Sequence, residues 1–278
     1  MTLPPQWFSM LLAELALIFR RSSGIGAMLV SVMIGVFTPL VLIWVQNNAG
    51  GAQINGAPVE GMVNFSAASS GGWALYVRHF FILPLLLLFA TGGSLAGELD
   101  QHTLREVLVR PVPRWSVLLA KMFALMGLST VCLVLTLIPS LGLGAALFGT
   151  ADPMKDVLLG YLASVGADLG IITFGLLAST FVRSVAGVVV SVVLLLIFDY
   201  AARTLLWLRE KMMGFIAESS GEELPEAVQY SQLLPGAALE CWQGYTGDWT
   251  VEPFVGLAIL VTVCLTAALV RFQRMDVP

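Results

Sequence analysis

Six long apolar segments, separated by shorter polar ones, set the pattern of this chain. They cover residues 24–44, 80–97, 116–138, 157–182, 185–207 and 253–270. A helix crosses the roughly 30 Å hydrocarbon core of a bilayer with about 20 apolar residues, and an open sheet cannot cross it because its edge groups lack partners. The pattern therefore predicts an all-α membrane protein with six transmembrane helices, forming one domain over residues 1–278.

A shorter amphipathic segment, residues 5–22, precedes the first span. Apolar residues such as Trp7 and Leu11 recur on one side at helical spacing. We predict an elbow helix that lies in the membrane interface, with Arg20 and Arg21 at the lipid headgroups. A helix buried against the bundle is the alternative interpretation.

Prolines and small residues mark the connections between the spans. Pro139 predicts a break in the third apolar segment, with residues 141–148 at the outer rim. The Gly-, Ala- and Ser-rich residues 47–75 predict an external loop or short surface helices. Arg78 and His79 are then expected to open the second span at the outer face.

Acidic residues gather in residues 208–252, between the fifth and sixth spans. Apolar residues such as Trp242 are interleaved with them, which indicates short amphipathic helices that fold back on the outer surface. Cys241 has no other external cysteine to pair with, so we expect a free thiol. Cys132 and Cys264 fall inside spans and are expected to be small core residues.

The composition agrees with this pattern, and the basic residues orient it. Hydrophobic residues make up 58% of the chain and charged residues 12%, and the mean hydropathy is +0.88. Lys and Arg in short loops mark the cytoplasmic side. Both termini are therefore predicted to be cytoplasmic, and no cleaved signal peptide is evident. The basic residues assigned to that side are Arg20, Arg21, Arg105, Arg110, Arg114, Lys121, Arg183, Arg271 and Arg274.

Signatures of catalysis are absent from the sequence. It contains no GxxxxGK[ST] phosphate-binding loop and no GxSxG motif, and its two histidines, His79 and His102, are predicted to lie near opposite faces. We therefore expect no catalytic residue, no metal site and no cofactor in this chain.

Asp168 is the one acidic residue near the middle of a predicted span. An ionisable group there is costly and suggests a functional site, such as a proton carrier or a substrate contact. The equally weighted alternative is a polar helix contact satisfied by Ser, Thr or a backbone group, with Gly166 and Gly170 allowing close packing. Asp199 and Arg203, four residues apart, predict an intrahelical pair.

The segment from residue 98 to 115 carries the densest cluster of arginines. Asp100 is expected to cap a helix whose first turn is residues 101–103, and Pro111 and Pro113 to end it. A short rigid helix between two spans would act as a lever on both. An ordinary amphipathic loop is the alternative.

Three stretches of this sequence resemble the membrane subunits of type-2 ABC exporters, which have six spans and a cytoplasmic N-terminal elbow helix. LLAELALIFRRS at residues 11–22 is similar to the family's elbow helix, where a glutamate (here Glu14) precedes a basic pair and the first span. FQRMD at residues 272–276 resembles the signature that follows the sixth span.

The middle stretch, GELDQHTLREVLVRPVPRWSVLLAK at residues 97–121, is similar to the family's segment between the second and third spans. An acidic residue, a turn, Thr-Leu, a Leu-rich helix, a proline, an arginine and a lysine follow in the family's order. His102 stands where the family often has glycine.

The resemblance implies a permease that is driven by another subunit. A cytoplasmic ABC ATPase, which binds ATP and Mg, would dock on the elbow helix and on the segment 98–115. Two permease chains, expected as a homodimer, would complete a transporter in the inner (plasma) membrane of a bacterium. The coupling residues implied are Glu98, Asp100, Thr103, Leu104, Arg105, Arg110, Pro111 and Arg114.

Two other functions remain open at this point. The same fold could transmit mechanical work to an extracytoplasmic partner through the acidic region 208–252. A proton-coupled secondary transporter would use Asp168 as its carrier. An intramembrane enzyme is disfavoured because no nucleophile–base pair is evident, and no nucleic-acid partner is expected.

Overall fold

The computed structural model describes residues 5–48, 53–54, 57–58, 65–103, 112–150, 154–220, 234–246 and 249–275. Its α-helices are α1 (Pro5–Arg20), α2 (Ser22–Asn48), α3 (Ala67–Val77), α4 (Leu83–Asp100), α6 (Arg114–Phe148), α7 (Lys155–Ser179), α8 (Val185–Ser220), α9 (Pro235–Leu239) and α10 (Glu252–Arg274). A π-helix, η1 (Arg78–Ile82), joins α3 to α4, and a 3-10 helix, η3 (Cys241–Thr246), follows α9. Strands β1 (Gln53–Ile54) and β2 (Ala57–Pro58) pair antiparallel, with Gln53 opposite Pro58.

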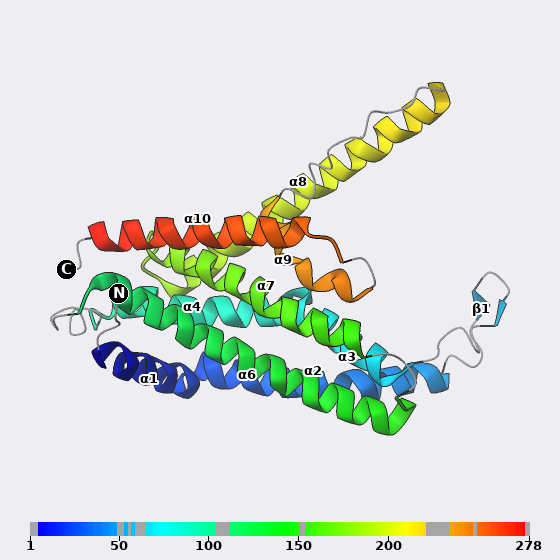
Figure 1. Ribbon diagram of the computed structural model, residues 1–278, viewed down its shortest axis with the longest axis horizontal. Helices are drawn as coiled ribbons and strands as arrows, with labels where there is room; N and C mark the ends of the chain where they lie inside the picture. The colour runs from blue at the N-terminus through cyan, green and yellow to red at the C-terminus, as the bar shows by residue number, and fades with distance from the viewer. Residues whose placement is uncertain are drawn as a thin grey trace.

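Six of the helices are long and apolar enough to cross a membrane, namely α2, α4, α6, α7, α8 and α10. The prediction of six spans is therefore confirmed over the described residues, and the chain is a multi-pass membrane protein. Figure 1 shows α2, α4, α6, α7 and α10 running alongside one another, with the start of α1 and the end of α10 at the same end of the bundle. The second half of α8 leaves the bundle at an angle.

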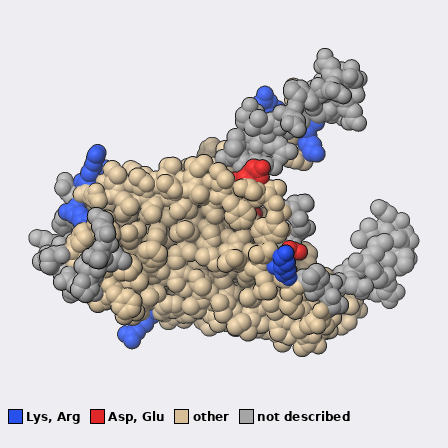
Figure 2. Space-filling view, in the orientation of Figure 1, with Lys and Arg blue, Asp and Glu red and all other residues tan. Residues whose placement is uncertain are grey.

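One end of the bundle carries most of the basic residues, and we call it the basic end. There α4 and α10 finish and α6 begins, so Arg114 and Arg274 lie at it. Figure 2 shows Lys and Arg projecting at this end and at the opposite end, where the visible Asp and Glu also lie, whereas the middle of the same face shows almost no charge. An uncharged belt between two charged ends is the surface that a bilayer requires.

Within residues 47–75, where an external loop or short surface helices were predicted, residues 67–75 belong to the buried helix α3, and residues 49–52, 55–56 and 59–64 lie outside the described part of the chain. Ser66 caps α3 by accepting a hydrogen bond from the Ser69 amide at 3.1 Å. Its small residues are buried, not exposed, and an added Cβ at Gly71 would lie 2.8 Å from Leu141 of α6. The helix that contains the second span therefore begins at Ala67, and Arg78 and His79 lie inside it instead of opening it.

α6 runs from Arg114 to Phe148 through Pro139, so the predicted break there is wrong. Proline removes one backbone donor, but serine hydroxyls and a neighbouring helix can stabilise a proline-containing membrane helix. Ser140 Oγ donates to Leu137 O at 3.0 Å, and Ser70 Oγ of α3 donates to Ser140 O at 2.9 Å. These contacts hold the helix on both sides of the proline.

Only part of the region 208–252 forms the separate short helices that were predicted. α8 continues as far as Ser220, whereas α9 and η3 are short helices packed against the middle of α7. Leu239 of α9 fills the space over Gly170, and the Cys241 thiol donates to Ala163 O at 3.6 Å. Cys241 is thus a free, buried thiol, as are Cys132 and Cys264.

Candidate functional site

Three buried charged side chains and the partly exposed Arg21 form a network near the basic end. Lys121 Nζ on α6 donates to Glu14 Oε1 on α1 at 2.8 Å and to Glu98 Oε2 on α4 at 2.7 Å. Arg21, just before α2, donates to Glu98 Oε1 at 2.7 Å. Lys121 is fully buried, and Glu14 and Glu98 are 6% and 9% exposed. We call these residues the four-charge network, and it joins four helices.

The network is electrically balanced, with two carboxylates against two cations. Buried charges are tolerated when they are paired and hydrogen-bonded, whereas removal of one partner leaves an uncompensated charge. α1 is brought into range because it packs on α6, where Trp7 meets Phe123 edge-on at 6.0 Å and Leu15 fits over Gly127. Arg20 is exposed and lies outside the network.

The described part of the segment 98–115 differs from the predicted capped helix. Asp100 is the last residue of α4, and residues 101–103 form a turn, so Asp100 does not cap a following helix. His102 has φ = 58°, a left-handed conformation that favours glycine. Thr103 Oγ1 donates to Glu98 O at 3.4 Å.

Near the other end of this segment, Arg114 is hydrogen-bonded to the C-terminal end of α10. Arg114 Nη1 donates to the backbone oxygens of Gln273 at 3.2 Å and Met275 at 2.8 Å. The other predicted coupling residues lie outside the described part of the chain, and they are Leu104, Arg105, Arg110 and Pro111.

Asp168 lies in a second buried cluster, about halfway along α7. Arg78 Nη2 donates to Asp168 Oδ2 at 2.6 Å and Arg78 Nη1 to Asp168 Oδ1 at 3.5 Å, and both residues are fully buried. Ser129 Oγ of α6 also donates to Asp168 Oδ2. The carboxylate is therefore met by a guanidinium and a hydroxyl. The serine belongs to the class of partner considered from the sequence, whereas the arginine was missed.

The π-helix η1 places Arg78 and His79 at this cluster. His79 Nδ1 faces Leu75 O at 3.0 Å, and His79 Nε2 faces Arg78 Nη1 at 2.9 Å. A carbonyl needs a donor and a guanidinium needs an acceptor, so these contacts fit a neutral imidazole protonated on Nδ1. The ring stacks on Trp242 with centroids 4.6 Å apart. A π-bulge of this kind often accompanies function.

The only sequence signal for the Arg78–Asp168 pair was the presence of two isolated charges in apolar surroundings. They stand 90 residues apart, and the sequence placed Arg78 at the outer face. Gly166 and Gly170 do accept close neighbours, because an added Cβ would lie 2.8 Å from Leu257 and 2.6 Å from Leu239 respectively.

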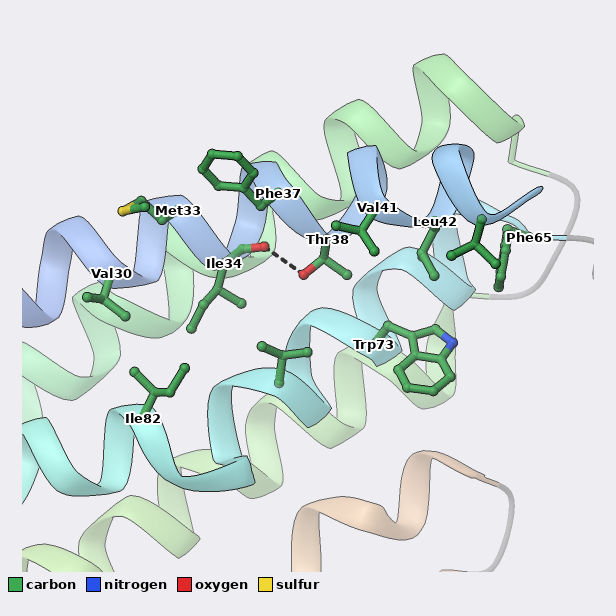
Figure 3. A pocket seen from close by; sticks show the side chains of 12 residues that line it. Val30, Met33, Ile34, Phe37, Thr38, Val41, Leu42, Phe65, Trp73 and Ile82 are labelled. Atoms are coloured by element: carbon green, nitrogen blue, oxygen red, sulfur yellow. Dashed lines mark hydrogen bonds between the residues drawn. The ribbon is translucent and has the colours of Figure 1, made fainter. Parts of the chain in front are cut away.

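An apolar groove of about 720 Å³ lies between α2 and the continuous helix of α3 and η1. Figure 3 shows Val30, Phe37 and Ile82 on its walls and Trp73 at one end. The Thr38 hydroxyl, the polar side chain on this wall, donates to Ile34 O at 2.7 Å. The groove consequently offers mainly hydrocarbon contacts, and the Trp73 indole N–H is its other polar group.

A family model described as "Protein of unknown function (DUF2705)" matches residues 28–278. No curated protein matches the chain. Among the described residues, no cluster of three or more His, Cys, Asp or Glu side chains could hold a metal ion.

Proposed function

This chain belongs to the DUF2705 family, and from that premise we propose that it is the membrane-spanning permease subunit of an ATP-driven ABC exporter, moved by a separate cytoplasmic ATPase. The observation that carries the proposal is the four-charge network. It links Glu98 on the helix that enters the segment 98–115 to Lys121 on the helix that leaves it, and both to α1.

The network supports a mechanical role because of where it sits. The ion pair between Lys121 and Glu98 joins α6 to α4 next to the segment 98–115. Glu14, which pairs with the same lysine, links α1 to these two helices. A force applied to the segment would therefore move three helices together, since separating a buried ion pair is energetically costly. Arg114 extends the connection to the end of α10.

The absent phosphate-binding loop fits a division of labour between subunits. The sequence has no GxxxxGK[ST], so ATP would be bound and hydrolysed on a partner that meets the basic end. Closure of that partner's ATP site would push on the segment 98–115, and the coupled helices would pass the movement into the membrane. Two copies of the chain would form the translocation path.

The Arg78–Asp168 pair favours this permease over a proton carrier. A carrier must exchange its proton with water, whereas Asp168 is fully buried and both of its oxygens face Arg78. The pair fits a structural contact that links α3–η1, α6 and α7 better than it fits a proton-carrying site.

Purification of the tagged chain from its native membranes tests the proposal. A subunit with a GxxxxGK[ST] sequence should co-purify, and the complex should hydrolyse ATP. Reversing the charge at Arg105 and Arg110 to Glu should abolish that association, because these arginines belong to the proposed docking segment. The matched control reverses Arg209 and Lys211 on the exposed part of α8 and should leave it intact. Full ATPase association in the Arg105/Arg110 variant would contradict the docking assignment.

A further inference from the structure

A cleft of about 440 Å³ opens where the second half of α8 departs from the bundle. α3 and η1 form one wall, α8 another, and α9 with η3 the third. Pockets of about 300–1,000 Å³ are the usual size for small-molecule sites. The cleft is separate from the four-charge network and lies beside the Arg78–Asp168 cluster through His79.

The charges in the cleft do not balance. Arg203 Nη1 and Nη2 each lie 2.9 Å from an oxygen of Glu240, and Arg203 Nε lies 3.0 Å from Asp199 Oδ2. One guanidinium is thus shared by two carboxylates. Next to the cleft, the Arg78 guanidinium is paired with Asp168, and the contacts of His79 fit a neutral imidazole ring. Neither residue therefore adds a net positive charge to the cleft. The described lining therefore carries one excess negative charge.

The shared guanidinium also decides which sign of ligand fits. All three nitrogens of Arg203 already face carboxylates, so an anion would find no available cation there. The Glu240 side chain is 40% exposed, so its charge faces the open space. A cation entering the cleft would meet that charge in surroundings of low polarity, where attraction is stronger than in water.

Aromatic rings line the cleft from four elements, namely α3, η1, α8 and η3. Tyr76 stacks on Phe80 at 6.1 Å and meets Trp242 at the same distance, while Tyr200 stands on α8. Phe80 is 72% exposed and Tyr200 66% exposed. Faces of such rings attract cations. The lining also contains the polar Gln243 and four apolar side chains, namely Pro84, Ile171, Leu196 and Leu239.

The cleft depends on one close backbone approach. A Cβ on Gly236 would lie 2.0 Å from Asp199 Oδ2 and 2.9 Å from Arg203 Nη2. Glycine therefore lets α9 come near enough for Glu240 to reach Arg203. The local sequence is built to bring these charges together.

We propose that this cleft binds an amphipathic organic cation, with its charge beside Glu240 and Asp199 and its apolar body against the aromatic walls. As a statement about exported cargo the inference rests on the proposed function, whereas as a statement about binding it stands alone.

Equilibrium binding of tritiated tetraphenylphosphonium to the full chain in lipid nanodiscs tests the inference. Binding should be saturable, and triphenylphosphine oxide, which has a similar apolar body and no net charge, should not displace it. Glu240→Gln and Phe80→Ala should each weaken binding by about tenfold. Arg203→Gln should strengthen it, because the excess negative charge grows; a merely structural role for Arg203 predicts the reverse.

Glu252→Gln is the matched control, since it removes the same charge from an exposed position at the start of α10 outside the cleft. Its affinity should equal that of the unmodified chain. Non-saturable uptake, displacement by triphenylphosphine oxide, or equal weakening by Glu252→Gln and Glu240→Gln would each overturn the inference. Phe80 is so exposed that its variant should fold, which keeps the test decisive.

The outcome also separates the two proposals. The binding measurement needs no ATPase, so saturable binding by a chain that recruits no ATPase would contradict the proposed function alone. A chain that forms an active ATPase complex but does not bind the cation would contradict the inference alone.

Discussion

Lys121 and Glu98 stand on the two helices that flank the segment between α4 and α6, and their side chains meet at 2.7 Å inside the protein. Neither helix can shift along the other without stretching this contact. Glu14 shares the same ammonium group at 2.8 Å, so the N-terminal helix is held by the same lysine. One buried cation thereby determines how three helices move relative to each other.

Lys121→Met should destabilise the protein strongly. The change leaves Glu14 and Glu98 buried without their shared cation, and breaking a buried pair in this way costs about 3–5 kcal/mol. Thermal unfolding in detergent, followed by circular dichroism, should show a large fall in Tm. Lys155→Met, at an exposed position on α7, is the control and should leave Tm nearly unchanged.

A second substitution should rescue that variant. Glu14→Gln added to Lys121→Met removes the unpaired carboxylate and leaves Glu98 with Arg21, so the network is neutral again. Most of the lost Tm should return. If the double variant were less stable than Lys121→Met, the balance of charges would not be what stabilises this end of the bundle.

His102→Gly should stabilise the turn that follows α4. The native φ of 58° is costly for a residue with a Cβ, so glycine should gain about 1 kcal/mol. His102→Val should do the opposite, because a β-branched side chain disfavours that conformation further. Thermal unfolding of the three proteins measures the order Gly above His above Val. The gain would also explain why glycine often stands here in the family that this segment resembles.

The spans were predictable because the bilayer imposes their length and composition on each segment by itself. α3 was not, since its Ala, Ser and Gly residues have too little apolar surface to indicate burial. They are buried by contacts that the sequence does not show, such as Gly144 against Ser70 and Gly71 against Leu141. Small residues allow helices to pack closely in membranes, so α3 can belong to the core although its sequence has low hydrophobicity.

The contacts between the charged residues could likewise not be predicted from the sequence. Glu14, Glu98 and Lys121 were each identified or placed near the basic end, but their meeting depends on how α1 folds against α6. Asp168 was identified as costly in a span, whereas its partner Arg78 was assigned to the outer face. A single sequence gives the cost of a buried charge and not the identity of the group that compensates it.

Asp168→Asn should impair folding, and a double apolar replacement should restore it. The single change leaves Arg78 buried opposite a neutral amide, whereas Arg78→Met with Asp168→Leu removes both charges and fills similar volume. Monodisperse protein on size-exclusion chromatography should be lost in the first variant and recovered in the second. Hydrolysis of ATP by the assembled complex should also recover, because the pair is structural in the proposed permease.

A proton carrier predicts a different result for the same double variant. It would fold and assemble but remain inactive, since no carboxylate would be left to carry the proton. Folded, assembled and inactive protein would therefore favour the secondary transporter over the permease. The single variant cannot separate these two functions, because it is expected to lose its fold in either case.

The orientation of the bundle decides whether any cytoplasmic ATPase can reach the segment 98–115. The native cysteines are all buried, so they should not react with a membrane-impermeant maleimide in intact cells. Thr250→Cys, exposed just before α10, should react in intact cells, whereas Gln273→Cys, exposed near the end of α10, should react only after permeabilisation. The excess of Lys and Arg at the basic end gives this direction through the positive-inside rule. The reverse labelling pattern would place Arg114 and the segment before it outside the cell, where ATP-driven coupling through that segment is impossible.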